Sequence, residues 1–262
     1  MPWYLFGQNS TGMHSVGATS SQTVDDSLMS EIKVLASTAL KPTLDEVLPD
    51  FERMHRHSVT LTFAPSVQIA KKVAAGEPCD VVLVTGQQFD DLVSLGKVVK
   101  ASRKDIASSV IGLAVRAGAT KPDISAPDGF KRAMLAAKSI AMSNPGGGGA
   151  SGAHLARIFE ALGIAEAMRP KLTYGPGGPN GLIGTFVQSG QVELGLQQIP
   201  ELMAVAGIEV VGPLPRELQM ETLFSIGLAS NAKDPETGKS LVSFMAGAPV
   251  AAVLKQKGMN SV

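Results

Sequence analysis

The chain has 262 residues, of which 44% are hydrophobic and 18% charged, and its 23 Lys and Arg balance 23 Asp and Glu. This composition is that of an ordinary globular protein, and zero net charge excludes the basic surface that nucleic-acid binding requires. No stretch approaches the roughly 20 apolar residues of a membrane-inserted helix, and the single Cys79 excludes an intrachain disulfide.

The first 30 residues differ from the rest of the chain. They contain no Lys or Arg, are rich in Ser, Thr and Gly, and show no hydrophobic periodicity. We therefore predict that residues 1–30 are a disordered extension. Their apolar stretch, 2–6, is shorter than the about 7–15 residues of a secretory signal, which also begins with basic residues. The chain as given is thus expected to be cytoplasmic, or periplasmic if its true N-terminus differs.

From Glu31 onward, short apolar runs alternate with amphipathic segments. In the first part of the chain we predict strands at 32–37, 58–64 and 79–85 and helices at 42–55, 66–76 and 87–96. The helix at 42–55 has apolar residues at helical spacing, and Pro42 suits a first helical position. Apolar strands that alternate with helices are typical of a mainly parallel sheet covered on both faces.

The second part of the chain repeats this alternation. We predict strands at 108–118, 139–143, 171–175, 192–198, 208–215 and 221–230 and helices at 129–137, 151–163, 180–190 and 238–258. The strands at 108–118 and 221–230 are the longest and are natural crossovers between two α/β lobes. We therefore predict one lobe from residues 31–108 and 230–262, a second from 109–229, and a ligand cleft between them.

Four predicted strand-to-helix junctions carry small, hydroxyl or amide residues. They read ASTALKP (36–42), APSVQ (64–68), NPGGGGASG (144–152) and GPGGPNG (175–181). Helix N-termini attract anions through their free N–H groups, and in open α/β sheets such junctions lie where ligands bind. At any single junction, helix capping or loop formation explains the same residues without a ligand. Four junctions together favour a cleft that holds a small anion with neutral donors.

The third junction contains four consecutive glycines. Gly147, Gly149 and Gly152 match the G-x-G-x-x-G pattern of dinucleotide-binding loops, but the next predicted strand, KLTYG, ends without the required acidic residue. A P-loop ends in G-K-[S/T], whereas Gly152 is followed by Ala153 and His154. We therefore predict no nucleotide cofactor, and a loop whose backbone N–H groups approach an anion closely.

Two titratable residues near the junctions are candidates for chemistry. The four His lack the spacing of a metal site, so we predict none. His154, in the first turn of the helix after the glycines, is the candidate acid or base, the alternative being a solvated or capping residue. Lys41 is a candidate positive charge for an anionic ligand, the alternative being an ordinary solvated lysine.

Two stretches of the chain, KVLASTALKPTLDEVLPDFER and FAPSVQIAKKVAAGEPCDVVLVTG, resemble the periplasmic molybdate-binding proteins of ABC importers. The resemblance runs from about Glu31 and is most specific in IAKKVAAGEPCDVVLV. It implies a type II periplasmic-binding-protein fold, with two α/β lobes, two crossover strands and an oxyanion cleft between the lobes. It also implies an ABC permease as a partner if the protein is exported. Some relatives resemble enzymes of the aconitate-isomerase type, which move a double bond in a tricarboxylate.

The resemblance implies ligand-binding residues in the first lobe. Ala39 stands where the family has a binding Ser, so Ser37 or Thr38 is expected to substitute for it. Ser66 matches the binding Ser of the second junction.

In the second lobe, the resemblance implies donors beside the glycine run and at the fourth junction. Ser151 corresponds to a backbone donor and lies next to Gly148 and Gly149, and Asn180 stands at another backbone-donor position. Gln198 occupies the place where molybdate binders commonly have a Tyr. Because amide side chains suit a carboxylate, these departures favour an organic ligand over molybdate.

Three functions are consistent with these observations, the third being a ligand-sensing domain without transport or catalysis. The first is a solute-binding-protein-like binder of a small anion, an organic carboxylate rather than molybdate, that closes by hinge motion. The alternative is a cytoplasmic isomerase or tautomerase of an unsaturated di- or tricarboxylate. In that case N–H donors of the glycine loop stabilise an enolate-like intermediate, and His154 or Lys41 transfers the proton.

Overall fold

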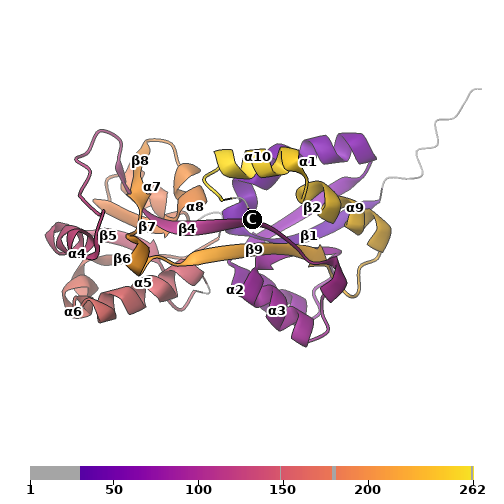
Figure 1. Ribbon diagram of the computed structural model, residues 1–262, viewed down its shortest axis with the longest axis horizontal. Helices are drawn as coiled ribbons and strands as arrows, with labels where there is room; N and C mark the ends of the chain where they lie inside the picture. Colours follow the sequence, from indigo (N-terminus) through magenta and orange to yellow (C-terminus); the bar gives the residue numbers. More distant parts are fainter. Residues whose placement is uncertain (1–29, 148, 179–180, 261) are drawn as a thin grey trace, which may run out of the picture.

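The computed structural model describes residues 30–147, 149–178, 181–260 and 262, whose helices and strands form two groups joined by two central strands (Figure 1). Apart from Ser30, the extension predicted at residues 1–30 lies outside the described residues.

The first group is built on three parallel strands. The central strand β1 (Glu31–Ser37) pairs with β2 (Ser58–Ala64) and with β3 (Val81–Thr85). The helices around them are α1 (Lys41–His55), α2 (Ser66–Ala74), α3 (Gly86–Ser94), α9 (Pro235–Met245) and α10 (Ala248–Gln256). Side chains of β3 alternate between the two faces: Val81 and Leu83 pack with α1, α9 and α10, whereas Val82 and Val84 pack with α2 and α3. Both faces are therefore covered, as uniformly apolar strands require.

The second group repeats this arrangement around β5 (Ile140–Ser143). β5 pairs in parallel with β6 (Leu172–Gly175) and β7 (Leu194–Gln198). The surrounding helices are α4 (Pro127–Ala136), α5 (Ala150–Ala161), α6 (Ala165–Met168), α7 (Ile183–Gln188) and α8 (Ile199–Met203). Ile140 and Met142 pack in the cluster that α4, α5 and α6 cover, and Ala141 packs on the opposite face against α7.

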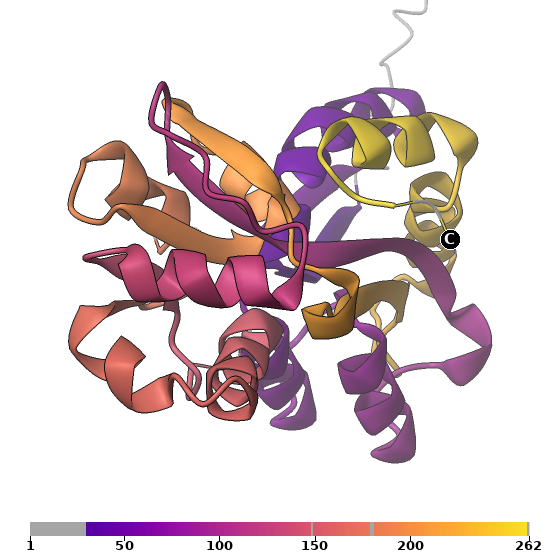
Figure 2. The same cartoon turned by 60° about the vertical axis from the view of Figure 1, so that its left-hand side comes forward.

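The long strands β4 (Lys104–Arg116) and β9 (Glu221–Leu228) connect the two groups (Figures 1 and 2). The strand order is β2-β1-β3-β9-β4-β7-β5-β6, and β8 (Ile208–Pro213) pairs with β4 off this path. The first half of β4 pairs with β9, which in turn pairs with β3, and the second half pairs with β7 and β8, all antiparallel. One strand thus belongs to both groups, and the lobe boundaries drawn at residues 108 and 230 stay a prediction.

The prediction of a single C-terminal helix at 238–258 is wrong. It forms two helices, α9 and α10, bent by 57° at a short break. Gly247 has an extended backbone (φ −79°, ψ 154°), and Pro249 in the first turn of α10 has no N–H to continue the helical ladder. Among the described residues no single helix is long and apolar enough to cross a membrane; only the bent pair reaches that length and composition. The apolar face of the pair, which includes Leu241 and Leu254, is buried against the first core.

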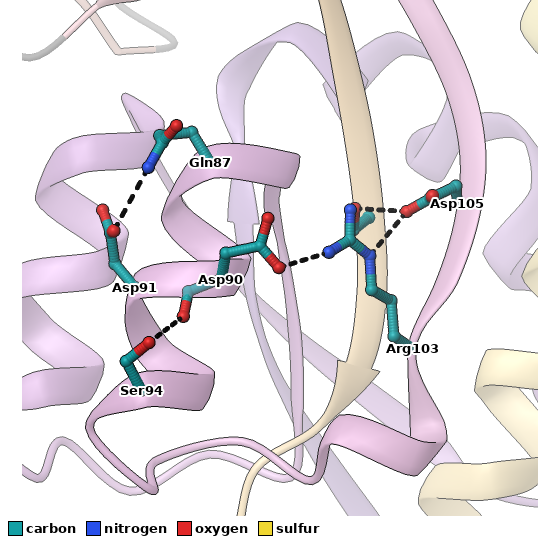
Figure 3. A network of polar contacts seen from close by, with 7 residues as sticks. Gln87, Asp90, Asp91, Ser94, Arg103 and Asp105 are labelled. Carbon is teal, nitrogen blue, oxygen red and sulfur yellow. Dashed lines mark hydrogen bonds and ion pairs between the residues drawn. The ribbon is translucent and has the colours of Figure 1, made fainter.

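Arg103 ties α3 to the beginning of β4 (Figure 3). Its Nη1 lies 2.6 Å from Asp90 Oδ1 on α3, and its Nε donates to Asp105 Oδ1 on β4 at 2.8 Å. Ser225 of β9 donates a further hydrogen bond of 2.6 Å to the same Asp105 oxygen. One guanidinium therefore links a helix to the crossover strands that carry the second lobe.

We expect Arg103→Ala to lower the free energy of unfolding by about 1 kcal/mol, because both ion pairs remain partly exposed to water. Urea denaturation measures this loss, which should shrink at high salt. Lys239→Ala is the matched control, since Lys239 and Glu236 form a 2.6 Å pair on the exposed face of one helix. An equal loss in both variants contradicts a linking role for Arg103.

Candidate functional site

A cavity lies between the two groups, at the carboxyl ends of their six parallel strands. Counted together with the solvent at its opening, the space free of protein atoms there is about 600 Å³. Ligands of open α/β sheets bind at these strand ends. The cavity is therefore the candidate binding site.

The wall from the first group is made by hydroxyl residues. Ser37 ends β1 and is followed by Thr38 in a short 3-10 turn (η1, Thr38–Leu40), while Ser66 begins α2 directly after β2. Ser37 is paired in register with Ala64, which brings these two junctions side by side. β3 contributes Thr85, whose backbone N–H donates a hydrogen bond of 3.3 Å to Ser66 Oγ.

The wall from the second group combines the glycine loop with amide side chains. Gly149 caps the start of α5, and Ser151 lies buried in the first turn of that helix. Gly177 lies in the loop after β6, and Gln197 and Gln198 end β7. Ser143, the last residue of β5, is paired in register with Gly175, the last residue of β6. This pairing brings the loops that follow the two strands side by side, as on the first wall.

Two buried polar atoms beside the cavity have no hydrogen-bond partner among the described residues. They are Thr38 Oγ1 and Gln198 Oε1. Gln198 Nε2 donates to Thr222 Oγ1 at 3.0 Å, so only half of that amide is paired. Because an unpaired buried polar group costs about 1–3 kcal/mol, we expect a ligand or water to satisfy both atoms.

The two walls touch across the mouth of the cavity. Gln68 Nε2 on α2 donates to the Gly147 carbonyl oxygen at 2.9 Å. Gly177 packs so closely on Pro65 that a Cβ atom there would lie 3.1 Å from Pro65 Cγ. These contacts join segments of the two groups around the cavity.

We expect Gln68→Ala to weaken ligand binding by a few-fold, because one neutral hydrogen bond that holds the walls together is worth about 1 kcal/mol. The stability of the ligand-free protein should change little, since Gln68 is exposed. Ligand dissociation rates from stopped-flow measurements test this. An unchanged dissociation rate shows that the contact does not help to retain the ligand.

The structure brings together most of the predicted site residues. Ser37, Thr38, Ser66, Gly149, Ser151 and Gln198 all line the cavity, as does Ala39. Gly148 and Asn180 lie outside the described residues.

The structure does not bring His154 or Lys41 to the cavity. His154 is one turn beyond Ser151 on α5, and its Nε2 lies 2.9 Å from the Leu218 carbonyl oxygen. Lys41 Nζ binds Asp45 Oδ2 at 2.6 Å in a neighbouring pocket. Each side chain has a partner on the protein, and neither residue is among those that line the cavity.

Glu201, which was not among the site residues predicted from the sequence, lines both the cavity and the neighbouring pocket. It is the one titratable side chain that borders the cavity within the described ranges. Burial raises its pKa from the ordinary 4.5 to about 7, against the opposing effect of a hydrogen bond with Gln197. The signal in the sequence was weak, because Glu201 lies on a five-residue helix that is too short to show periodicity.

The cavity offers hydroxyl, amide and backbone donors, with no Lys, Arg or His among its described lining residues. The described part of the chain also holds no group of three His, Cys, Asp or Glu arranged to bind a metal ion. The geometry thus suits a small anion bound by neutral donors.

Residues 32–260 match the family of bacterial extracellular solute-binding proteins. The protein belongs to this family. It is 36% identical over 237 residues to an aconitate isomerase of a Pseudomonas species, covering 88% of each chain. It is 20% identical over 232 residues to the molybdate-binding protein ModA of Escherichia coli, covering 88% of this chain and 89% of that protein.

The fold is that of the type II periplasmic binding proteins, as predicted. The structure superimposes on the periplasmic molybdate-binding protein of Azotobacter vinelandii with a TM-score of 0.71 at 19% identity, covering 87% of this chain and 98% of that one. The predicted resemblance to molybdate-binding proteins and aconitate-isomerase-like enzymes is confirmed.

Proposed function

We propose that this protein binds a small unsaturated polycarboxylate in the cavity and shifts its double bond. The observation that carries this proposal is the cavity itself: two facing sets of neutral donors with one carboxyl group, Glu201, at their edge. The 36% identity to an aconitate isomerase over 88% of both chains supports the substrate class.

The donors of the two walls suit a ligand with carboxylates at both ends. Ser37, Thr38 and Ser66 offer hydroxyl groups from one side, and the N-terminus of α5 with Ser151 offers donors from the other. A carboxylate accepts several such hydrogen bonds, and charge-assisted bonds are about twice as strong as neutral ones. A polycarboxylate that bridges the walls thus stabilises the contact between them.

The half-paired amide of Gln198 also supports a carboxylate ligand. A hydroxyl both donates and accepts, so turning the amide by 180° keeps the bond with Thr222 and directs the NH2 group to the unpaired side. That NH2 group then donates to an anion. A buried Gln in this place adds to the donors for a carboxylate without adding charge.

Thermal unfolding and isotope exchange test the proposal together. Aconitate isomers, saturated di- and tricarboxylates, molybdate, tungstate and sulfate are added separately, and a ligand at 100 times its Kd should stabilise the fold by about 2.7 kcal/mol. Proton NMR in deuterated water should then show interconversion of the aconitate isomers, and any deuterium that enters at carbon reports removal of the proton. Stabilisation by molybdate or tungstate but by no carboxylate overturns the proposal.

A second candidate function is the binding and delivery of a solute without chemistry, which the family match over residues 32–260 favours. In that role the walls close on a carboxylate, and the protein delivers it to an ABC permease. The protein then acts in the periplasm. Strong thermal stabilisation by a carboxylate with no interconversion of the isomers supports this function over the first.

A further inference from the structure

We propose that Glu201 is the catalytic residue that carries the proton between two carbons of the substrate. This inference rests on the proposed isomerase function. Neighbouring lining residues such as Thr38, Gln198 and Thr222 bear hydroxyl or amide groups, which do not accept a proton from carbon at neutral pH. Since neither His154 nor Lys41 lines the cavity, the carboxyl of Glu201 is the described group that is placed to do so.

Gln197 holds this carboxyl in place. Its own side chain is 2% exposed, and its Oε1 accepts a hydrogen bond of 2.8 Å from the backbone N–H of Ile183 at the start of α7. That bond fixes the amide orientation, so its NH2 group is the part that bonds to Glu201. Gln197 is therefore a positioning residue, which orients a proton carrier without touching the reacting carbons.

The chemistry balances with one carboxylate alone. Glu201 takes a proton from the CH2 carbon next to the double bond, and the electron pair of the broken C–H bond forms the new C=C bond. The electron pair of the old C=C bond moves to its far carbon, and Glu201 returns the proton there. Negative charge that spreads onto the substrate carboxylates in between is stabilised by the N–H and hydroxyl donors of the two walls.

The environment of Glu201 gives its carboxyl a pKa that suits both the removal and the return of a proton. Desolvation places its pKa at about 7, near the value at which a group both takes and returns a proton efficiently. The charged side chains that share the adjoining pocket are Lys41, Asp45 and Lys257. Lys41 is paired with Asp45, and Lys257 Nζ lies 2.6 Å from Glu46 Oε2, so each cation has its own carboxylate partner.

Glu201→Gln tests the proposal, because it keeps the shape of the side chain and removes its basicity. We expect kcat for isomerisation and exchange at carbon to fall by about 100-fold or more. Ligand-induced thermal stabilisation should remain, with Kd changed by less than about 10-fold. Glu236→Gln, on the exposed end of α9, is the matched control and should retain wild-type turnover.

Gln197→Ala separates positioning from a merely structural role. We expect it to raise the pH midpoint of the kcat profile, because the hydrogen bond that it removes lowers the pKa of Glu201. Isomerisation by Glu201→Gln at the wild-type rate overturns the role of Glu201 but leaves the isomerase function standing. Absence of isomerisation by the wild-type protein with every unsaturated polycarboxylate overturns both.

Discussion

Gly152→Ala is expected to lower the free energy of unfolding by about 1–3 kcal/mol, because it overpacks the contact between α5 and β5. A Cβ atom at Gly152 would lie 2.4 Å from the carbonyl oxygen of Ser143 and 3.0 Å from that of Asn144. Both are backbone atoms at the end of β5, whose pairing with β6 prevents a simple retreat. The first turn of α5 must therefore move away, and Ser151 moves with it.

The loss at Gly152 should appear in both stability and binding. Urea denaturation measures the first, and the rise in melting temperature with added carboxylate measures the second. Gly149→Ala is the matched control: its Cβ would have Ser143 Cβ at 3.7 Å as its nearest neighbour, an ordinary contact, and its φ is −83°. Because alanine is compatible with that backbone, stability should stay within about 0.5 kcal/mol or rise. Equal losses in the two variants contradict the packing argument.

Glu201→Gln is expected to raise the stability of the protein at pH 8 by about 1–3 kcal/mol. In the wild type, the folded state keeps the Glu201 proton up to pH about 7, whereas the unfolded chain releases it near 4.5. Between these values the folded state binds more protons, so stability falls as the pH rises. Each pKa unit corresponds to about 1.4 kcal/mol, and the partial exposure of the side chain favours the lower end of the range.

Denaturation curves from pH 4 to pH 8 measure this effect as the difference between variant and wild type. The difference should be smallest near pH 4 and level off above pH 7. Subtracting the wild-type curve removes the contributions of shared carboxyl groups such as Asp105 and Asp234, whose pKa values are lowered in the folded state. Glu236→Gln, at an exposed position, is the control substitution. A flat difference for Glu201→Gln means that burial does not hold the proton on this carboxyl.

The glycine run lies at the cavity, as predicted, although its resemblance to a dinucleotide-binding motif does not describe its role there. The match of Gly147, Gly149 and Gly152 to a dinucleotide fingerprint arises here without the acidic partner that nucleotides need. The last glycine of that fingerprint permits close packing of helix on strand, and Gly152 meets the Ser143 carbonyl in this way. The run shapes a cavity wall through backbone packing, a role that does not depend on a nucleotide.

The sequence by itself determined the order of the strands and of the longer helices and the position of the junctions, whereas the short helices α6 and α8 were not predicted. Apolar runs and helical periodicity are local properties, so β1, β2 and α1 lie within a few residues of their predicted ranges. The same holds for Ser37, the last residue of β1, and for Ser66, the first residue of α2 after β2, because the carboxyl ends of these strands meet at one edge in this fold. The break between α9 and α10 was missed because a single extended Gly247 outweighs the helical pattern on both sides of it.

Only the tertiary structure decided which described titratable group borders the cavity. His154 turns to a carbonyl that is 64 residues away in the chain, and Gln197 is fixed by an N–H 14 residues away. Such pairings depend on how distant segments pack, and no local pattern records them. Glu201 became the candidate proton carrier because packing brought its carboxyl, alone among the described titratable groups, to the edge of a cavity of neutral donors.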